Sequence, residues 1–175
     1  MNATLASTPR AQGSGAQFEA LYRSCADDLY AYVASLLRDR SAAKDVTALA
    51  FERAYRRRAL FDLRRGSARA WLFGIARNAA LDELRRRQRV GPLVGELADQ
   101  SAQAEDDDEF AERRLVVRDG LAALDPRERE VILLKFVGRL SNAELARVLG
   151  CSESNAGTRL HRAIKQLREA CHAAQ

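Results

Sequence analysis

Apolar residues recur at helical spacing along most of the chain. Between residues 17 and 37 they fall on one face of a single long helix. The same spacing continues over about 42–60, where Ser41 is the expected N-cap, and over about 68–88. The sequence lacks the period-two alternation of a half-buried strand. The pattern therefore predicts an all-α protein.

The helical periodicity is lost between residues 91 and 111. Gly91, Pro92 and Gly95 interrupt this stretch, and an unbroken acidic run occupies 105–109. Like charges repel and extend such a segment, so it predicts a flexible acidic linker. The expected division is a flexible leader over 1–15, a small helical domain over 16–90, the linker over 91–111 and a second small helical domain over 112–175. The linker leaves open whether the two domains lie together or apart.

The second domain carries the pattern of a helix-turn-helix. Ser141 with Glu144 predicts a capping box, Gly150 stands where the turn requires a positive φ, and Ser152 is suited to cap the final helix. That helix is expected to lie in the major groove of DNA and to read base edges. The candidate base-reading residues are Ser154, Asn155, Thr158, Arg159 and Arg162. A generic helical hairpin would share part of this pattern.

Charge divides the chain into three blocks. Residues 1–90 hold 17 basic and 9 acidic side chains, a balance of +8. Residues 91–112 hold 8 acids and no base, and residues 113–175 hold 12 bases and 7 acids, a balance of +5. The two basic blocks suit a polyanionic partner such as DNA, although solvated helix faces would give the same charge.

The sequence offers little to catalysis, metal binding or membrane insertion. Cys25, Cys151 and Cys171 are odd in number and lack CxxC spacing, which argues against a disulfide framework and a zinc site. The apolar runs are far shorter than the roughly 20 residues of a membrane span. We therefore expect a cytoplasmic protein without cofactor or metal, and an enzyme is the least favoured class.

Two sets of motifs resemble the conserved regions of extracytoplasmic-function (group IV) RNA polymerase sigma factors. The motifs that resemble region 4 are 125–134 (DPREREVILL), 140–141 (LS), 144–146 (ELA), 149–152 (LGCS) and 159–163 (RLHRA). The motifs that resemble region 2 are 43–46 (AKDV), 51–54 (FERA) and 66–78 (GSARAWLFGIARN). The two sets occur in the order of the family and are joined by the predicted linker.

The resemblance implies a protein that binds bacterial core RNA polymerase and directs promoter-specific initiation. In the family the second helix of region 2 docks on the β′ clamp helices, which assigns core binding to Asp45, Ala48, Leu49 and Glu52. The third helix and its preceding loop recognise and open the −10 element, which assigns this role to Arg64, Arg65, Trp71, Arg77, Asn78, Arg85 and Arg86. Region 4 reads the −35 element through the final helix and meets the β flap. An anti-sigma factor is a common partner in the family.

Three positions depart from the family pattern. Lys44 and Leu49 alter the expected polymerase-facing surface, and Gly157 removes a basic side chain from the final helix. The alternatives to a sigma factor are a stand-alone helix-turn-helix regulator and a sigma-like protein that sequesters an anti-sigma factor. Trp71 has its own alternative, because a core position explains a tryptophan there as well as base stacking does.

Overall fold

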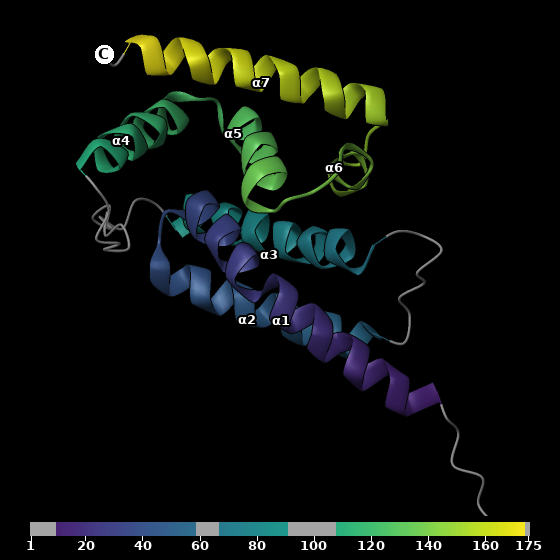
Figure 1. The fold of residues 1–175 in the computed structure, drawn as a ribbon. Coiled ribbons are helices and arrows are strands. Elements are labelled where there is room, and N and C mark those ends of the chain that lie inside the picture. The colour runs from purple at the N-terminus through teal and green to yellow at the C-terminus, as the bar shows by residue number, and fades with distance from the viewer. Residues whose placement is uncertain (1–9, 59–66, 91–107, 174–175) are drawn as a thin grey trace, which may run out of the picture.

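The computed structural model describes residues 10–58, 67–90 and 108–173, and within these ranges every element is a helix (Figure 1). The N-terminal domain contains α1 (Arg10–Leu37), α2 (Arg40–Arg57) and α3 (Ala68–Val90). The C-terminal domain contains α4 (Asp108–Ala123), α5 (Pro126–Ile132), the π-helical η3 (Leu133–Val137), α6 (Asn142–Leu149) and α7 (Glu153–Ala173). The predicted all-α fold class is confirmed. No helix within the described ranges is long and apolar enough to cross a bilayer.

Three helix starts differ from the sequence expectation. The first helix begins at Arg10, inside the expected leader, because apolar periodicity reports only the packed part of a helix. The N-cap of α2 is Asp39 and not Ser41: its carboxylate accepts the backbone amide of Ala42 at 3.0 Å. Helix α4 begins at Asp108, inside the expected linker. The rest of the expected leader and linker, residues 1–9 and 91–107, lies outside the described residues.

Helices α1, α2 and α3 pack around a shared apolar core. Cys25, Leu29 and Val33 of α1 are fully buried, as their spacing predicted, and Leu72 of α3 joins them. The thiol of Cys25 is therefore a core group. Burying these side chains supplies the main favourable free energy of this domain.

The C-terminal domain is organised around α7, which packs against α4, α5 and α6. Arg129 of α5 fixes the end of α4: its guanidinium donates to the carbonyl oxygens of Leu121, Ala122 and Leu124 at 2.6, 2.9 and 3.0 Å. These are carbonyls that the helix end leaves without intrahelical partners. One side chain thus ties the end of α4 to α5.

The helix that starts as α5 changes to π geometry in η3. The amide of Gly138 donates to the carbonyl oxygen of Leu133 at 2.9 Å, which is a bond to the residue five positions back. In this wider turn the side chains of the neighbouring Leu133 and Leu134 both point into the protein interior, where they are buried.

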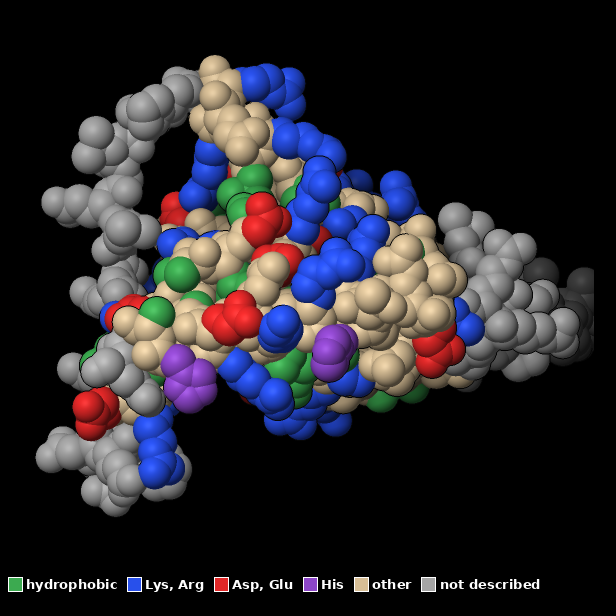
Figure 2. Space-filling model, turned by 90° about the horizontal axis from the view of Figure 1, so that it is seen from above, with side chains coloured by type: hydrophobic (Ala, Val, Ile, Leu, Met, Phe, Trp, Pro, Cys, Tyr) green, Lys and Arg blue, Asp and Glu red, His purple; other side chains and the backbone are tan. Residues whose placement is uncertain are grey.

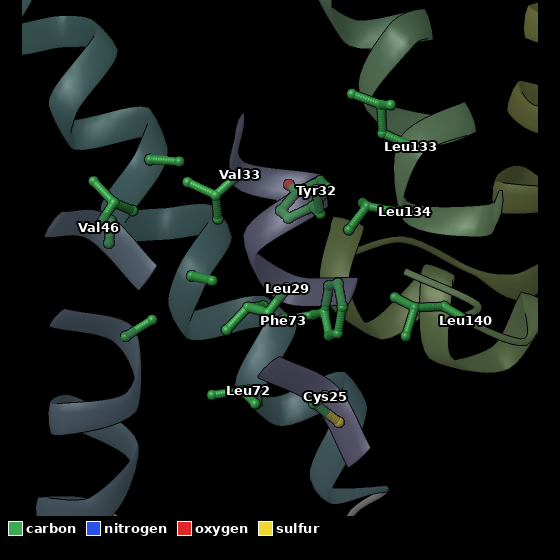
Figure 3. Close-up of a cluster of buried hydrophobic side chains, with 14 of the residues drawn as sticks. Cys25, Leu29, Tyr32, Val33, Val46, Leu72, Phe73, Leu133, Leu134 and Leu140 are labelled. Carbon is green, nitrogen blue, oxygen red and sulfur yellow. The ribbon is translucent and has the colours of Figure 1, made fainter. Parts of the chain in front are cut away.

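The two domains form one continuous core. Tyr32 of α1 and Phe73 of α3 lie 5.6 Å apart between ring centroids, and both are completely buried. Leu134 and Leu140 of the C-terminal domain approach them from the other side (Figure 3). The domains are therefore packed together, with η3 and α6 covering α1 and α3.

Candidate nucleic-acid interface

The helix-turn-helix has the local geometry that the sequence predicts. Ser141 Oγ accepts the amide of Glu144 at 3.2 Å, and Glu144 Oε2 accepts the amide of Ser141 at 2.8 Å, which completes the capping box. Gly150 ends α6 with φ +67°. Ser152 Oγ accepts the amide of Asn155 at 3.2 Å and caps α7. Both helix starts and the turn between them are thus fixed by residues within the motif itself.

The predicted base-reading residues of α7 share one solvent-facing side. All five are exposed: Ser154, Asn155, Thr158, Arg159 and Arg162. Ala156, Leu160 and Ala163 are buried and hold the opposite side of the helix against the domain. Helix α7 lies at the end of the molecule remote from α1–α3 (Figure 1). On the face seen from the α7 side, Lys and Arg side chains predominate over Asp and Glu (Figure 2).

Thr158 and Gly157 limit what the polar side of α7 offers to DNA. The hydroxyl of Thr158 donates to the carbonyl oxygen of Ser154 at 3.0 Å, so its hydrogen-bonding need is met within the helix. Gly157 leaves a gap in the face, because a Cβ placed there would meet nothing within 4 Å. The departure from the family pattern at Gly157 is therefore not required by packing.

The predicted −10 residues on α3 are found in different surroundings. Asn78 is exposed and Trp71 is half-buried. Arg77 is engaged with Glu130 of the C-terminal domain: Nε and Nη2 donate to the two carboxylate oxygens at 2.8 and 3.1 Å. Arg64 and Arg65, the remaining residues assigned to the preceding loop, lie outside the described residues.

The arginines near the end of α3 are exposed and paired within the helix. Arg85 contacts Asp82 at 3.2 Å, and Arg86 donates twice to Glu83 at 2.8 Å. Hydrogen bonds from Arg86 and then Arg87 lower the pKa of Glu83 to about 2. The Arg86 side chain is still 66% exposed, and a solvent-screened pair of this kind is weak enough for a phosphate to compete with it.

The predicted polymerase-binding residues occupy one side of α2. Asp45, Ala48 and Glu52 are exposed and Leu49 is half-buried, at the spacing that aligns side chains along a helix. Glu52 contacts Arg56 at 2.7 Å. Lys44, the departure from the family pattern, is exposed directly beside Asp45, so the surface combines both signs of charge.

Polar contacts that the sequence did not predict also join the two domains. Arg69 Nε donates to the carbonyl oxygen of Gly138 at 2.8 Å, and Nη2 donates to the carboxylate of Asp28 within the N-terminal domain. Ser67 Oγ donates to the carboxylate of Glu144. For the contact between Arg77 and Glu130, the sequence shows only that Glu130 is an acid directly before an apolar run in α5. It does not show that Arg77 of α3 is the partner.

Comparison with known families matches both halves of the chain. The family described as Sigma-70 region 2 matches residues 21–90, and Sigma-70, region 4 matches residues 114–167. The chain is 35% identical to "ECF RNA polymerase sigma factor SigL" of Mycobacterium tuberculosis, over 91% of this chain and 93% of that protein. It is 32% identical to "ECF RNA polymerase sigma factor SigX" of Bacillus subtilis, over 87% of this chain and 82% of that one.

Solved structures show the same fold. CnrH, in complex with the cytosolic domain of CnrY, matches with a TM-score of 0.68 and 26% identity over 94% of this chain and 96% of that one. The sigma factor RpoE, in complex with the anti-sigma factor NepR from Bartonella quintana, matches with a TM-score of 0.74 over 91% of this chain and 99% of that one. The RpoE match has 24% identity and shows the likeness of fold alone.

Proposed function

The chain belongs to the extracytoplasmic-function RNA polymerase sigma factors, and from this premise we propose how its surfaces divide the work of promoter-specific transcription initiation. The N-terminal domain is region 2 and the C-terminal domain is region 4. The activity is binding without catalysis: the chain docks on core polymerase, reads two promoter elements and helps to open one of them.

Region 4 reads the −35 element as duplex DNA through α7. The observation that supports this most directly is the exposed polar side of α7, held outward by a turn and two N-caps. Asn155 can donate and accept at an adenine edge, Arg159 can donate twice at a guanine edge, and the Thr158 methyl can meet a thymine methyl. Arg162 extends the basic surface toward the phosphates.

Region 2 recognises the −10 element through α3 and the loop before it. Asn78 offers both a donor and an acceptor to an unpaired base, and Arg85 and Arg86 are exposed cations for the strand's phosphates. Arg64, Arg65, Trp71 and Arg77 complete the proposed set. Holding a single strand with cations and trapping its bases favours the open state of the duplex.

Core polymerase binds the side of α2 formed by Asp45, Ala48, Leu49 and Glu52, through its β′ clamp helices. Region 4 is proposed to meet the β flap. We also propose an anti-sigma factor as a regulatory partner, supported by the likeness to CnrH, which was solved with the cytosolic domain of CnrY.

The test is a core-binding and transcription assay. Purified protein is mixed with bacterial core polymerase, the complex is isolated by gel filtration, and transcription is run on a genomic fragment pool. A stable complex with new discrete start sites supports the proposal, and the sequences upstream of those starts give both elements. Binding to duplex DNA without a polymerase complex would instead indicate a stand-alone regulator. A complex that starts no transcript would indicate a sequestering protein.

A further inference from the structure

Four aromatic rings form a strip across α1 and α2, at the end of the N-terminal domain where α1 begins and α2 ends (Figure 1). The ring of Tyr22 lies 4.7 Å from that of Phe51 between centroids. The ring of Phe18 lies 6.4 Å from that of Phe51 and 5.2 Å from that of Tyr55. We call this series, from Tyr22 through Phe51 and Phe18 to Tyr55, the aromatic strip.

The two ends of the aromatic strip are open to solvent, and its middle is covered. Tyr22 is 50% exposed and Tyr55 is 48% exposed, whereas Phe51 is buried and Phe18 is half-buried. Each exposed ring is therefore held against a ring that is itself packed on the core. A ring fixed in advance loses little conformational entropy when a flat partner stacks on it, so the strip is preorganised for stacking.

A cation lies over one end of the aromatic strip. The guanidinium carbon of Arg58 is 3.9 Å from the ring centroid of Tyr55, and Nη1 donates to the carbonyl oxygen of Tyr55 at 2.7 Å. Aromatic rings and planar guanidinium groups are the two kinds of side chain on which proteins stack nucleic-acid bases. Both kinds occur here side by side.

The surroundings of the aromatic strip carry a positive balance. Residues 52–58 hold four arginines and one acid, a balance of +3. That acid, Glu52, contacts Arg56 at 2.7 Å, and Glu19 is paired with Arg23. Both acids are thus compensated by a cation one turn further along the same helix. Rings that stack bases, next to cations that meet phosphates, are the combination that binds single-stranded nucleic acid.

An unpaired strand is the form of DNA that suits the aromatic strip. In a duplex the flat faces of the bases are stacked on one another, and only an unpaired base offers a face to a protein ring. Helix α3, to which binding of the −10 element is assigned, begins at the same end of the N-terminal domain at which α2 ends (Figure 1). Opening the −10 element on α3 would therefore bring an unpaired strand close to the strip.

We propose that the aromatic strip is a second single-strand site, in which Tyr22 and Tyr55 stack unpaired bases next to the −10 element and the arginines of 53–58 meet their phosphates. This inference rests on the proposed function of α3, which brings the strand to the strip. It assigns DNA to α1 and α2, whereas the proposed −10 residues belong to α3 and the loop before it. The strip lengthens the strand that the protein holds and so favours the open promoter.

The first test measures single-strand binding by the full chain without polymerase. Fluorescence anisotropy follows a labelled short strand of thymidines with the natural protein, Tyr22→Leu, Tyr55→Leu and the double variant. Tyr22→Phe and Tyr55→Phe are the matched controls, because they keep the ring. We expect each leucine variant to weaken binding at least about fivefold and the phenylalanine variants to bind as the natural chain does.

Three outcomes of this first test would overturn the proposal. They are absence of single-strand binding by the natural chain, unchanged binding by the double leucine variant, and equal losses in the leucine and phenylalanine variants. Circular dichroism checks that every variant keeps its helices. Because both tyrosines are half exposed, their replacement is expected to leave the fold intact.

The second test locates the strip in the open promoter. Holoenzyme is assembled from the full chain and core polymerase on promoter DNA with a pre-opened bubble, in which iodouracil replaces single bases next to the −10 element. Ultraviolet light joins iodouracil to a stacked ring, and mass spectrometry identifies the residue. We expect crosslinks at Tyr22 or Tyr55. Crosslinks to α3 or to polymerase alone would overturn the strip and leave the proposed function standing. Absence of a polymerase complex would overturn the proposed function, and the first test would then decide on the strip.

A third measurement separates a DNA site from a protein contact. Tyr55 follows Glu52 of the proposed polymerase-binding side by three residues, so core polymerase could cover the strip instead of DNA. The affinity of the same leucine variants for core polymerase is measured without DNA. We expect it to be unchanged. Weaker binding of core polymerase with unchanged single-strand binding would make the strip part of the polymerase contact and overturn the proposal.

Discussion

Helices α3 and α7 are both arginine-bearing helices assigned to DNA, yet they are presented in opposite ways. Helix α7 buries one side against its own domain and leaves its polar side in solvent. Helix α3 packs against α1 and α2 and is covered by α6 as well, so it is a central element of the molecule. A basic helix is available for DNA only where its surroundings leave a side uncovered, and charge alone does not reveal which helix that is.

The largest effect is expected from the apolar part of the α3 surface. Phe73→Ala removes a completely buried ring and should lower the free energy of unfolding by about 3–5 kcal/mol. Phe136→Ala is the matched control, because that ring is 59% exposed, and it should change stability by less than about 0.5 kcal/mol. Urea unfolding followed by circular dichroism measures both. Equal losses would show that α3 is not central to the fold.

The polar side of α7 should show the opposite behaviour. Asn155→Ala and Arg159→Ala are expected to leave stability unchanged and to weaken −35 binding by about 1–3 kcal/mol on the preferred sequence. Fluorescence anisotropy with duplexes altered at single positions measures the loss, and Arg168→Ala, exposed later on the same helix, is the control. Equal weakening on every duplex would make these residues phosphate contacts.

A pH titration tests the ion pairs that Glu83 makes with the arginines of α3. The pKa of Glu83 is about 2 in the folded chain against an ordinary 4.5, so its contribution is complete above about pH 4.5 and is lost as pH falls toward 2. Glu83→Gln should therefore lower stability by about 1–2 kcal/mol at pH 7 and much less at pH 2.5. Urea unfolding at both values measures this. An equal loss of stability at both pH values would contradict the assignment.

The smallest effects concern the two glycines that flank the start of the −35 face. Gly157→Ala should raise stability by about 0.5–1 kcal/mol, because its Cβ meets nothing and alanine favours the helix. Gly150→Ala should lower stability by about 1 kcal/mol or more, since φ is +67° there. Thermal unfolding compares the two. Changes of the same sign would show that the local backbone is not what distinguishes these positions.

The sequence predicted the features that depend on neighbouring residues. Ser141, Glu144, Gly150 and Ser152 act within a few positions of one another, and all were assigned correctly. The N-cap of α2 was predicted wrongly: Ser41 was expected, and Asp39 caps the helix. Ser41 and Asp39 are both good N-caps, and Asp39 is further held by Arg87 at 2.9 Å, a contact between residues 48 positions apart. Tertiary structure therefore decides which of the two residues caps α2.

In the candidate site, too, the features set by local spacing were predicted, and those set by tertiary structure were not. The exposure of the α7 residues followed from helical spacing, because spacing alone separates the buried side from the polar side. The pairing of Arg77 with Glu130 did not, because it depends on how two separately readable domains approach each other. Phe73 likewise contacts Tyr32 of α1 and lies against Gly138 of the other domain, and the helical spacing of α3 does not reveal that second contact.

The π-helical turn of η3 has a consequence for the length of this segment. A π-turn holds one residue more than the α-turn it replaces, and here that residue lets neighbouring Leu133 and Leu134 both reach the interior. Deleting one residue between 133 and 137 would return the segment to α geometry and rotate what precedes it, including Glu130, by about 100° relative to Gly138. In evolutionary terms, we expect alignments of relatives to keep the length of this segment.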